Sequence, residues 1–330
     1  MNKWINVSCG AILLTTAMAM PSSAQDLIIR AGLTDPLDTP YGEAMLEFKK
    51  IMQEGTDGRI EVQLFPSAQL GALAEQLENV QTGAQEMTLV SPAYSSQFFP
   101  AFNVLELPFL VTNWDEAGKM LNSDAFSTLT SDAEKAIGVK IVGNFPYGFR
   151  NVANSDHPVV LLDDLKGLKL RTQSSPVHIA AFEALGANPI AIDWSETYQA
   201  VQTGVVDGLE NANSVLIANH FPEIAPNISV THHLFGMLLV VMNAKVYDDL
   251  SDDDQALLES AINAAEEINL RRALEIEESS VAELEKMGAK VNNVAPDQIA
   301  AMRAAIAPVY EKFGPEFEPY LSGLQNAIAN

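Results

Sequence analysis

One long helix is predicted near the C-terminal end of this 330-residue chain. Apolar residues recur at helical spacing from Leu257 to Leu284, after a start at Ser251 that resembles a capping box with Asp in place of Glu. Gly288 can end the helix in a left-handed conformation. About 36 residues at 1.5 Å each give roughly 54 Å, which is longer than one lobe of a chain this size. We therefore expect the helix to connect two lobes; a long packing helix in one large domain is the alternative.

Strands and helices alternate through the rest of the chain, which predicts an α/β fold with a mostly parallel sheet. Apolar residues at every second position, or short apolar runs, mark the expected strands at 27–31, 59–65, 87–90, 139–143 and 168–171. The pattern restarts after Phe149 with helices expected at 177–185 and 195–203. The expected lobes are residues 25–147 with 237–276, and residues 148–236 with 277–330.

An arginine lies at the end of one of these strands. The segment Asp164-Leu-Lys-Gly-Leu-Lys-Leu-Arg171 is a short strand with alternating apolar residues. In open α/β sheets, ligands bind beyond the carboxyl ends of the strands. A guanidinium is always charged and can hold a carboxylate through two parallel hydrogen bonds. The sequence thus makes a small organic anion the first ligand to consider, and a surface salt bridge of Arg171 is the alternative.

Several ordered motifs resemble the solute-binding proteins of TRAP transporters, of the DctP type. They are the segments 164–171, Ala184-Leu-Gly-Ala-Asn-Pro189 and Glu196 to Asn211, with support from Pro66–Gly71 and Glu106–Phe109. The resemblance covers nearly the whole chain after its first residues. It implies a two-lobed clamshell, of the type II periplasmic binding protein kind, with a long helix joining the lobes. It also implies a receptor that binds a small carboxylate and delivers it to an integral-membrane TRAP permease driven by an ion gradient.

The resemblance assigns ligand contacts to particular residues of the second lobe. It implies that Arg171 makes the two-pronged contact to the ligand carboxylate and that Arg150 points into the cleft from the lobe junction. Asn211 is expected to orient the carboxylate or a hydroxyl, and Trp194 to lie against the ligand. The alternatives are an interlobe salt bridge for Arg150, a cap for Asn211 and a plain core position for Trp194.

The first lobe supplies weaker candidates. Ser91 and Tyr94 lie where the first lobe of the family meets its ligand, and Asp35 or Asp38 are candidates for hydroxyl contacts. The resemblance leaves Glu75 and Tyr198 undecided between cleft and structure. Relatives that bind sialic acid carry acidic residues where this chain has Leu73 and Ser91, which argues against that ligand. A uronate or aldonate is the first choice of ligand, and a C4-dicarboxylate with one arginine per carboxylate is the second.

The net charge and the N-terminal segment indicate which partners and which cell compartment to expect for the protein. The formal net charge of −24 opposes a general affinity for nucleic acid or anionic membranes. Lys3, the apolar run 11–20 and the small residues 22–24 read as an export signal, so residues 1–24 are expected to be a cleaved signal peptide. Cys9 is the only cysteine and would leave with it. We therefore expect a periplasmic protein, monomeric and without disulfides.

The sequence gives little support to the hypothesis that the protein is an enzyme. G-x-S-x-G, Walker, G-x-G-x-x-G and H-E-x-x-H motifs are all missing from it. The pair His232-His233 could suggest a metal, but neighbours on a strand point to opposite faces, so a capping or surface role is favoured. We therefore predict no enzyme activity, no cofactor and no metal. A secreted lyase or hydrolase of acidic sugars is the remote alternative, and a structural or adhesive secreted protein is a third class.

Overall fold

The computed structural model describes residues 26–330, so the predicted signal peptide, residues 1–24, lies outside the described part. A nine-stranded sheet forms the centre, in the order β2-β1-β3-β8-β4-β7-β5-β6, with β9 beside β8. The strands are β1 (Leu27–Gly32), β2 (Ile60–Phe65), β3 (Met87–Val90), β4 (Val139–Asn154), β5 (Lys169–Thr172), β6 (Asn188–Ala191), β7 (Gly208–Ala212), β8 (Asn227–Asn243) and β9 (Lys290–Asn293).

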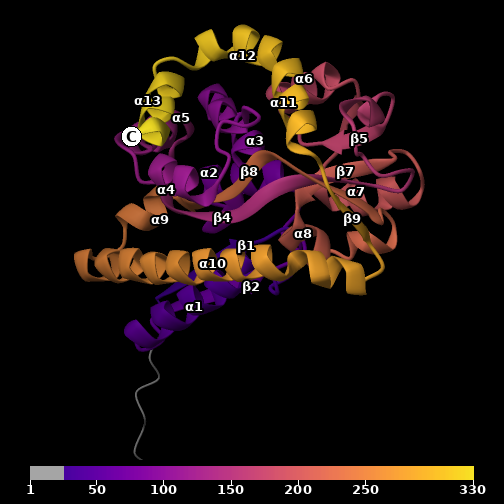
Figure 1. Ribbon diagram of the computed structural model, residues 1–330. Coiled ribbons are helices and arrows are strands. Elements are labelled where there is room, and N and C mark those ends of the chain that lie inside the picture. Colours follow the sequence, from indigo (N-terminus) through magenta and orange to yellow (C-terminus); the bar gives the residue numbers. More distant parts are fainter. Residues whose placement is uncertain (1–25) are drawn as a thin grey trace, which may run out of the picture.

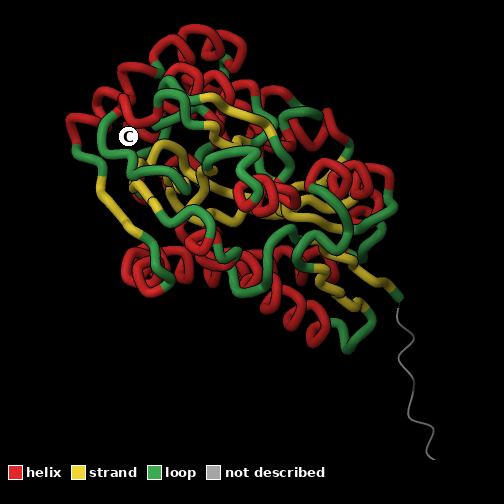
Figure 2. Tube along the Cα trace, turned by 90° about the vertical axis from the view of Figure 1, so that its right-hand side faces the viewer, coloured by secondary structure: helices red, strands yellow, loops and turns green. Residues whose placement is uncertain are grey.

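Helices cover both faces of the sheet, and Figure 2 shows helices above and below the central strands. They are α1 (Pro40–Gly55), α2 (Leu73–Thr82), α3 (Pro92–Ser95), α4 (Trp114–Leu121), α5 (Asp124–Ile137), α6 (Pro176–Ala184), α7 (Trp194–Gln202), α8 (Asn213–Ala218), α9 (Ala244–Asp248), α10 (Asp252–Lys286), α11 (Pro296–Ala305), α12 (Ala307–Phe313) and α13 (Tyr320–Ala329). Four 3-10 helices are η1 (Pro100–Glu106), η2 (Leu162–Leu165), η3 (Phe221–Glu223) and η4 (Gly314–Phe317). The predicted α/β fold is confirmed.

Two long antiparallel strands, β4 and β8, run through the middle of the sheet. On one side β8 pairs with β3, and β1 follows with β2; on the other side β4 pairs with β7, and β5 follows with β6. The outer pairs are parallel, as expected, but the central pairs are antiparallel. The prediction also ended the fourth strand at Gly143, and the residues that follow include Pro146 and Gly148, which usually interrupt strands. The ladder instead continues to Asn154 through register shifts at those positions.

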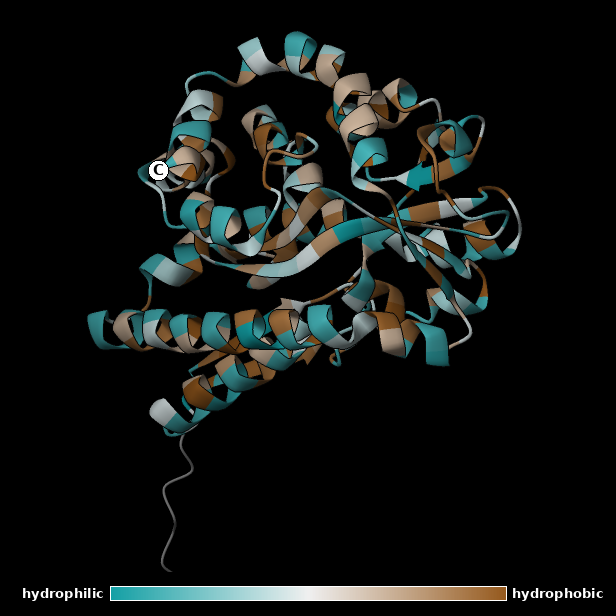
Figure 3. Ribbon diagram, in the orientation of Figure 1, coloured by the Kyte–Doolittle hydropathy of each residue, from teal (hydrophilic) through white to brown (hydrophobic). Residues whose placement is uncertain are grey.

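The long helix α10 spans Asp252–Lys286, close to the predicted bounds. Ser251 caps its N-terminus by accepting a hydrogen bond from the backbone N–H of Asp254. In Figure 1 the helix runs beneath the sheet from one side of the molecule to the other. It packs on α1 and β4 at one end and on α8 and β9 towards the other. Figure 3 shows the alternation of hydrophobic and hydrophilic residues along it, which fits a helix with one buried face.

The C-terminal segment arches over the molecule in Figure 1, from α11 near α6 to α13 near α4 and α5. Tyr320 at the start of α13 donates a hydrogen bond of 2.8 Å to Asp132 of α5, and Gly323 lies against Ala125. Residues 320–329 thus lie against helices of the first half of the chain, whereas the predicted division placed them with the second. The division into lobes stays a prediction. Within residues 26–330 no helix has the length and apolar character needed to cross a membrane.

Candidate functional site

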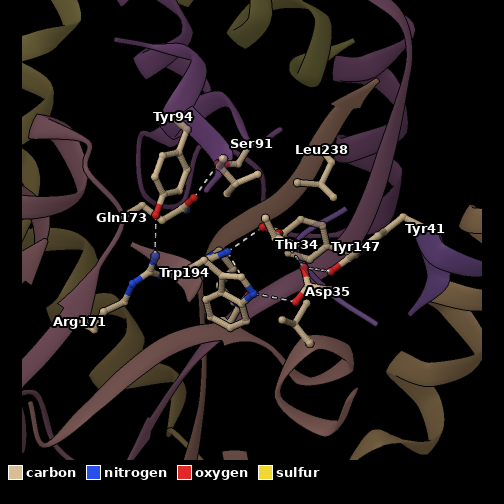
Figure 4. Close-up of a pocket in the computed structure, with 14 residues that line it drawn as sticks. Thr34, Asp35, Tyr41, Ser91, Tyr94, Tyr147, Arg171, Gln173, Trp194 and Leu238 are labelled. Atoms are coloured by element: carbon tan, nitrogen blue, oxygen red, sulfur yellow. Dashed lines mark hydrogen bonds between the residues drawn. The ribbon is translucent and has the colours of Figure 1, made fainter. Parts of the chain in front are cut away.

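A pocket lies between the two sides of the sheet. One wall comes from the loop after β1, the start of α2 and the β3–α3 junction, and the other from β5, α7 and β7. All seven predicted site residues line it. Figure 4 labels five of them, Asp35, Ser91, Tyr94, Arg171 and Trp194. The full lining set is Thr34, Asp35, Tyr41, Leu73, Ser91, Tyr94, Tyr147, Arg150, Arg171, Gln173, Trp194, Asn211, Val215 and Leu238.

Arg171 reaches the pocket from the end of β5 and is only 1% exposed. Its Nε donates to the carbonyl oxygen of Ile192 at 2.8 Å, and its Nη2 donates to the hydroxyl of Tyr94 at 2.9 Å. The guanidinium also lies 5.4 Å from the centre of the Trp194 ring. A guanidinium has five N–H groups. Three of those of Arg171, two on Nη1 and one on Nη2, therefore have no acceptor among residues 26–330. These three form the edge that suits a carboxylate.

Arg150 lines the same pocket, but its donors are all in use. Nε and Nη2 hold the carboxylate of Glu210 at 2.5 and 2.7 Å, and Nη2 also donates to the Glu210 carbonyl at 2.9 Å. Nη1 donates to the Tyr147 hydroxyl at 2.7 Å and to Oδ1 of Asn211 at 2.9 Å. The pair connects neighbouring strands β4 and β7. It is not the interlobe bridge that we weighed as the alternative, and Arg150 offers no free fork to a ligand in this conformation of the described chain.

The carboxylate of Glu210 is fully buried, with a relative exposure of 0%. Burial alone would raise its pKa, but the charge and the hydrogen bonds of Arg150 hold that pKa well below its usual range. His233 approaches with Nε2 at 3.3 Å, and its Nδ1 lies 2.8 Å from the Thr231 hydroxyl. Burial lowers the pKa of His233, although Glu210 opposes the shift. The cluster thus combines a cation, an anion and a neutral histidine.

The position of His233 corrects the earlier expectation for the His232-His233 pair. His232 is partly exposed beside Glu277, as a surface role requires, but His233 is buried against Glu210. Both lie in an irregular part of β8, where His232 has a positive φ of 44° and the register with β4 shifts between Ser229 and Leu234. Among residues 26–330, no cluster of three or more His, Cys, Asp or Glu side chains could hold a metal ion.

Asn211 and Tyr147 present donors to the pocket because Arg150 occupies their oxygens. Oδ1 of Asn211 accepts from Arg150 and, at 2.9 Å, from the backbone N–H of Ala212. Its Nδ2 has no acceptor in the described part of the chain. Burial raises the pKa of Tyr147 to about 12, although Arg150 acts to lower it, so its hydroxyl keeps its proton. An amide N–H and a phenol O–H are therefore available here to the oxygen of a ligand.

Trp194 and Asp35 contact each other across the pocket. The Trp194 indole N–H donates to Oδ1 of Asp35 at 2.8 Å, and Asn219 donates to the same oxygen at 2.8 Å. Tyr41 donates to Oδ2 at 2.6 Å. Burial raises the pKa of Asp35, while these three hydrogen bonds act to lower it. Asp35 was a candidate for hydroxyl contacts and Trp194 was expected to lie against the ligand; in the structure their polar groups bond to each other between the two walls.

Sequence reasoning missed Gln173 among the polar lining residues. Its Oε1 accepts from the Ser91 hydroxyl at 2.6 Å, which leaves Nε2 without an acceptor in the described structure. Gln173 is the first residue after β5, two positions beyond Arg171, so its place at the same strand end could have pointed to it. Of the undecided residues, Asp38 and Glu75 are exposed and outside the lining set, and Tyr198 packs against Phe221 with ring centres 5.5 Å apart.

Comparison with known proteins shows which protein family this chain is similar to. Residues 32–316 match the family model DctP, described as bacterial extracellular solute-binding protein, family 7. The chain is 30% identical over 308 residues to the C4-dicarboxylate-binding periplasmic protein DctP of Rhodobacter capsulatus, covering 92% of this chain and 91% of that protein. It is 35% identical over 236 residues to the 2,3-diketo-L-gulonate-binding periplasmic protein YiaO of Escherichia coli, covering 71% of each.

One solved structure has the same fold over nearly the full length of both chains. It is the sugar acid binding protein DctPAm from Advenella mimigardefordensis in complex with galactonate. Its TM-score against this chain is 0.89 at 28% sequence identity, and the alignment covers 92% of this chain and 97% of that one.

Proposed function

The chain belongs to the DctP family of bacterial extracellular solute-binding proteins, family 7, and on that premise we propose that its pocket captures a small organic acid for a TRAP-type permease. The proteins of this family are solute receptors and not enzymes. The receptor role follows from membership. The residues that hold the ligand, the identity of the ligand and the partner are the proposal.

The free edge of the Arg171 guanidinium is the observation that carries the proposal. Three N–H groups of a buried cation have no acceptor within residues 26–330, although Tyr94 and Ile192 fix the orientation of the group. Leaving a buried donor unpaired has a cost of about 1–3 kcal/mol, and more for a charged group. A ligand carboxylate bound to Nη1 and Nη2 would remove that cost through two charge-assisted hydrogen bonds. Arg171 is therefore the proposed anchor.

Further donors surround the anchor and suit the oxygens of an oxygenated acid. Asn211 Nδ2, Gln173 Nε2 and the Tyr94 and Tyr147 hydroxyls are proposed to bind oxygens next to the carboxylate. Trp194 flanks the ligand with its ring, because its N–H is taken by Asp35. Ser91 and Asp35 act by connecting the two walls of the pocket and not by direct recognition. Arg150 has a positioning role, since it fixes Asn211 and Tyr147.

A sugar acid such as an aldonate or a uronate is the favoured ligand. The relative YiaO is named for 2,3-diketo-L-gulonate and the structure of DctPAm contains galactonate, which are both sugar acids. A C4-dicarboxylate is the second candidate, because the Rhodobacter capsulatus relative is named for that class.

We propose that the two predicted lobes, 25–147 with 237–276 and 148–236 with 277–330, close around the ligand by bending of β4 and β8. Gly148 of β4 pairs with Gly236 of β8, next to a register shift, and Gly148 has a positive φ of 109°. Glycine tolerates backbone changes that other residues resist. The hydrogen bonds Ser91–Gln173, Asp35–Trp194 and Tyr94–Arg171 join the lobes, which fits a closed form of the clamshell.

Membership of the family supports a location outside the cytoplasm, and the periplasm is the proposed compartment. Residues 1–24 are proposed to be the signal peptide that directs export, and the mature chain is proposed to act as a monomer. The partners are then the carboxylate ligand and the membrane subunits of the permease. Nucleic acid is not a proposed partner, because the net charge of −24 would repel it.

A thermal-shift screen of residues 25–330 tests the function. Uronates, aldonates, C4-dicarboxylates and 2-oxo acids would be compared at equal concentration. A ligand that binds only the native state adds RT ln(1 + [L]/Kd), about 4 kcal/mol at a thousandfold excess over Kd. Stabilisation by one class of acids supports the proposal and identifies the ligand class. Stabilisation by none of the acids, in protein shown to be free of a retained ligand, would contradict it.

A further inference from the structure

A second contact between the two predicted lobes lies outside the ligand pocket. It joins the 3-10 helix η1 of the first lobe to the start of α6 in the second lobe. Ser175 Oγ donates to Oδ1 of Asn103 at 2.8 Å, and Nε2 of His178 lies 3.0 Å from Oε2 of Glu106. None of these four side chains belongs to the set that lines the pocket. The four residues form what we call the η1–α6 seam.

The spacing of the seam residues matches on its two sides. Asn103 and Glu106 are three positions apart in η1, and side chains at that spacing in a 3-10 helix eclipse one another. Ser175 caps α6 by accepting from the backbone N–H of His178 at 3.3 Å, so its own hydrogen can point to Asn103. The two links therefore lie side by side, and the first lobe holds the capping residue of a helix in the second.

The seam is both buried and polar. Its four residues have exposures between 0% and 5%. The contact between His178 and Glu106 does not have the alignment of a hydrogen bond, so the two facing atoms and Nδ1 of His178 lack a hydrogen-bond partner within residues 26–330. Buried polar groups without partners are costly, whereas water satisfies them once the two surfaces separate. The seam therefore has a small net strength and can open and close, unlike an apolar core contact.

We infer that the η1–α6 seam is a latch that stabilises the closed form of the receptor without touching the ligand. The inference rests on the proposed function, because it concerns closure of the same two lobes. The hydrogen bonds Ser91–Gln173 and Tyr94–Arg171 also join the lobes, but they lie in the pocket, where a ligand competes for their atoms. The seam is outside the pocket, so its contacts persist whichever ligand is bound.

A latch of this kind changes the affinity for every ligand equally. A receptor that binds its ligand in the closed form has an apparent dissociation constant inversely proportional to the closed fraction. Loss of the latch lowers that fraction and multiplies the dissociation constants of all acids by one factor. A side chain in contact with the ligand would instead affect acids of different structure by different factors. Asn103 and His178 are thus positioning residues.

The variant His178→Leu tests the latch in the mature protein, residues 25–330. It removes the one basic side chain in ion-pair contact with the buried Glu106 carboxylate among the described residues, which disfavours the closed form. Isothermal titration calorimetry with galactonate, glucuronate and succinate gives the dissociation constants. We expect each acid that binds the wild type to bind at least fivefold more weakly, by factors that agree within threefold. A smaller loss, or unequal factors, in a folded variant would overturn the inference.

A double variant separates the latch from a general role in packing. Glu106→Met combined with His178→Leu replaces the pair by apolar side chains, a change that is often neutral or stabilising for a buried ion pair. We expect the double variant to bind each acid at least threefold more tightly than His178→Leu alone. Two independent packing defects would instead add to each other, so the absence of this recovery in a folded double variant would overturn the inference.

Two further variants complete the test. His157→Leu removes a partly exposed histidine that contacts Asp156 within the second lobe, so its dissociation constants should equal those of the wild type. Asn103→Ala removes the acceptor of Ser175 and should weaken every acid by one factor of about threefold to tenfold. If His178→Leu does not fold in thermal melting, Asn103→Ala decides alone, and an unchanged affinity would overturn the inference. Failure of the proposed function looks different, since no acid would then bind the wild-type protein, and the inference would fall with it.

Discussion

Removing the guanidinium of Arg171 is the most direct perturbation of the proposed site. In Arg171→Gln the charge and the fork are lost, and a ligand carboxylate would be buried without a cation. Truncating one partner of a buried hydrogen-bonded charge pair costs about 2–5 kcal/mol. At about 1.4 kcal/mol per tenfold change, this weakens binding from roughly 30-fold to several thousandfold. Arg171→Lys keeps the charge but loses the fork, and we expect about half of that loss in free energy.

The assay is isothermal titration calorimetry with the acid identified by thermal shift. Arg171 also donates to Ile192 and Tyr94, so the melting temperature of each ligand-free variant must be measured first. Arg271→Gln is the matched control, because Arg271 is exposed on α10 and pairs with Glu275 away from the pocket. Its dissociation constant should equal that of the wild type. A change of less than twofold in a folded Arg171→Gln variant would refute the assignment of the anchor.

Three further predictions concern closure, pH and packing. Asp35→Asn weakens the acceptor for the hydrogen bonds from Trp194 and Asn219. Hydrogen bonds to charged groups contribute about 1.5–3 kcal/mol, so the ligand affinity should fall by roughly tenfold. Unchanged affinity in calorimetry would contradict a role of Asp35 in joining the lobes. The pKa of Glu210 is lowered on folding, so the stability it contributes is present above about pH 4.3 and is lost as the pH falls towards the folded pKa. Urea unfolding between pH 6 and 3 should therefore show a shallower loss of stability for Glu210→Gln than for the wild type, and parallel curves would contradict this. Gly236→Ala would place a methyl group 2.2 Å from the Tyr147 ring, so the free energy of unfolding in urea should fall by about 1–3 kcal/mol. The control Gly118→Ala in α4 has open space and should raise the free energy of unfolding by up to about 1 kcal/mol. Equal effects of the two changes would count against a tightly packed hinge at Gly236.

The sequence predicted which residues surround the pocket better than it predicted what each of them does. Arg171 and Asn211 belong to continuous motifs and Trp194 lies between two of them, so a strand end and a resemblance were enough to place them. Their hydrogen-bond partners are distant in sequence: Arg150 pairs with Glu210 and Trp194 with Asp35, across 60 and 159 positions. No local pattern indicates such pairs. Their geometry depends on the register of β4 against β7 and on the packing of the two lobes.

The length of β4 shows a second limit of sequence reasoning. Pro146 and Gly148 suppress a strand signal locally, and only the ladder with β8, about ninety residues later, shows that the strand continues. The helix α10 was predicted within a few residues because 3.6-residue periodicity and caps are local properties. Local patterns thus determine the individual elements, while long-range pairing determines the sheet order and the polar network of the pocket.

The sharing of β4 and β8 by both sides of the sheet has a consequence for how the chain folds. β3 lies next to residues 239–242 of β8, so the first half of the protein lacks the neighbour of its last strand until most of the chain has been synthesised. A fragment that stops at residue 147 would leave an edge of β3 unpaired, and such edges promote aggregation. Contacts between distant segments also form slowly. The nascent chain therefore cannot complete its first lobe early, and neither lobe corresponds to a fragment that could be produced by simple truncation.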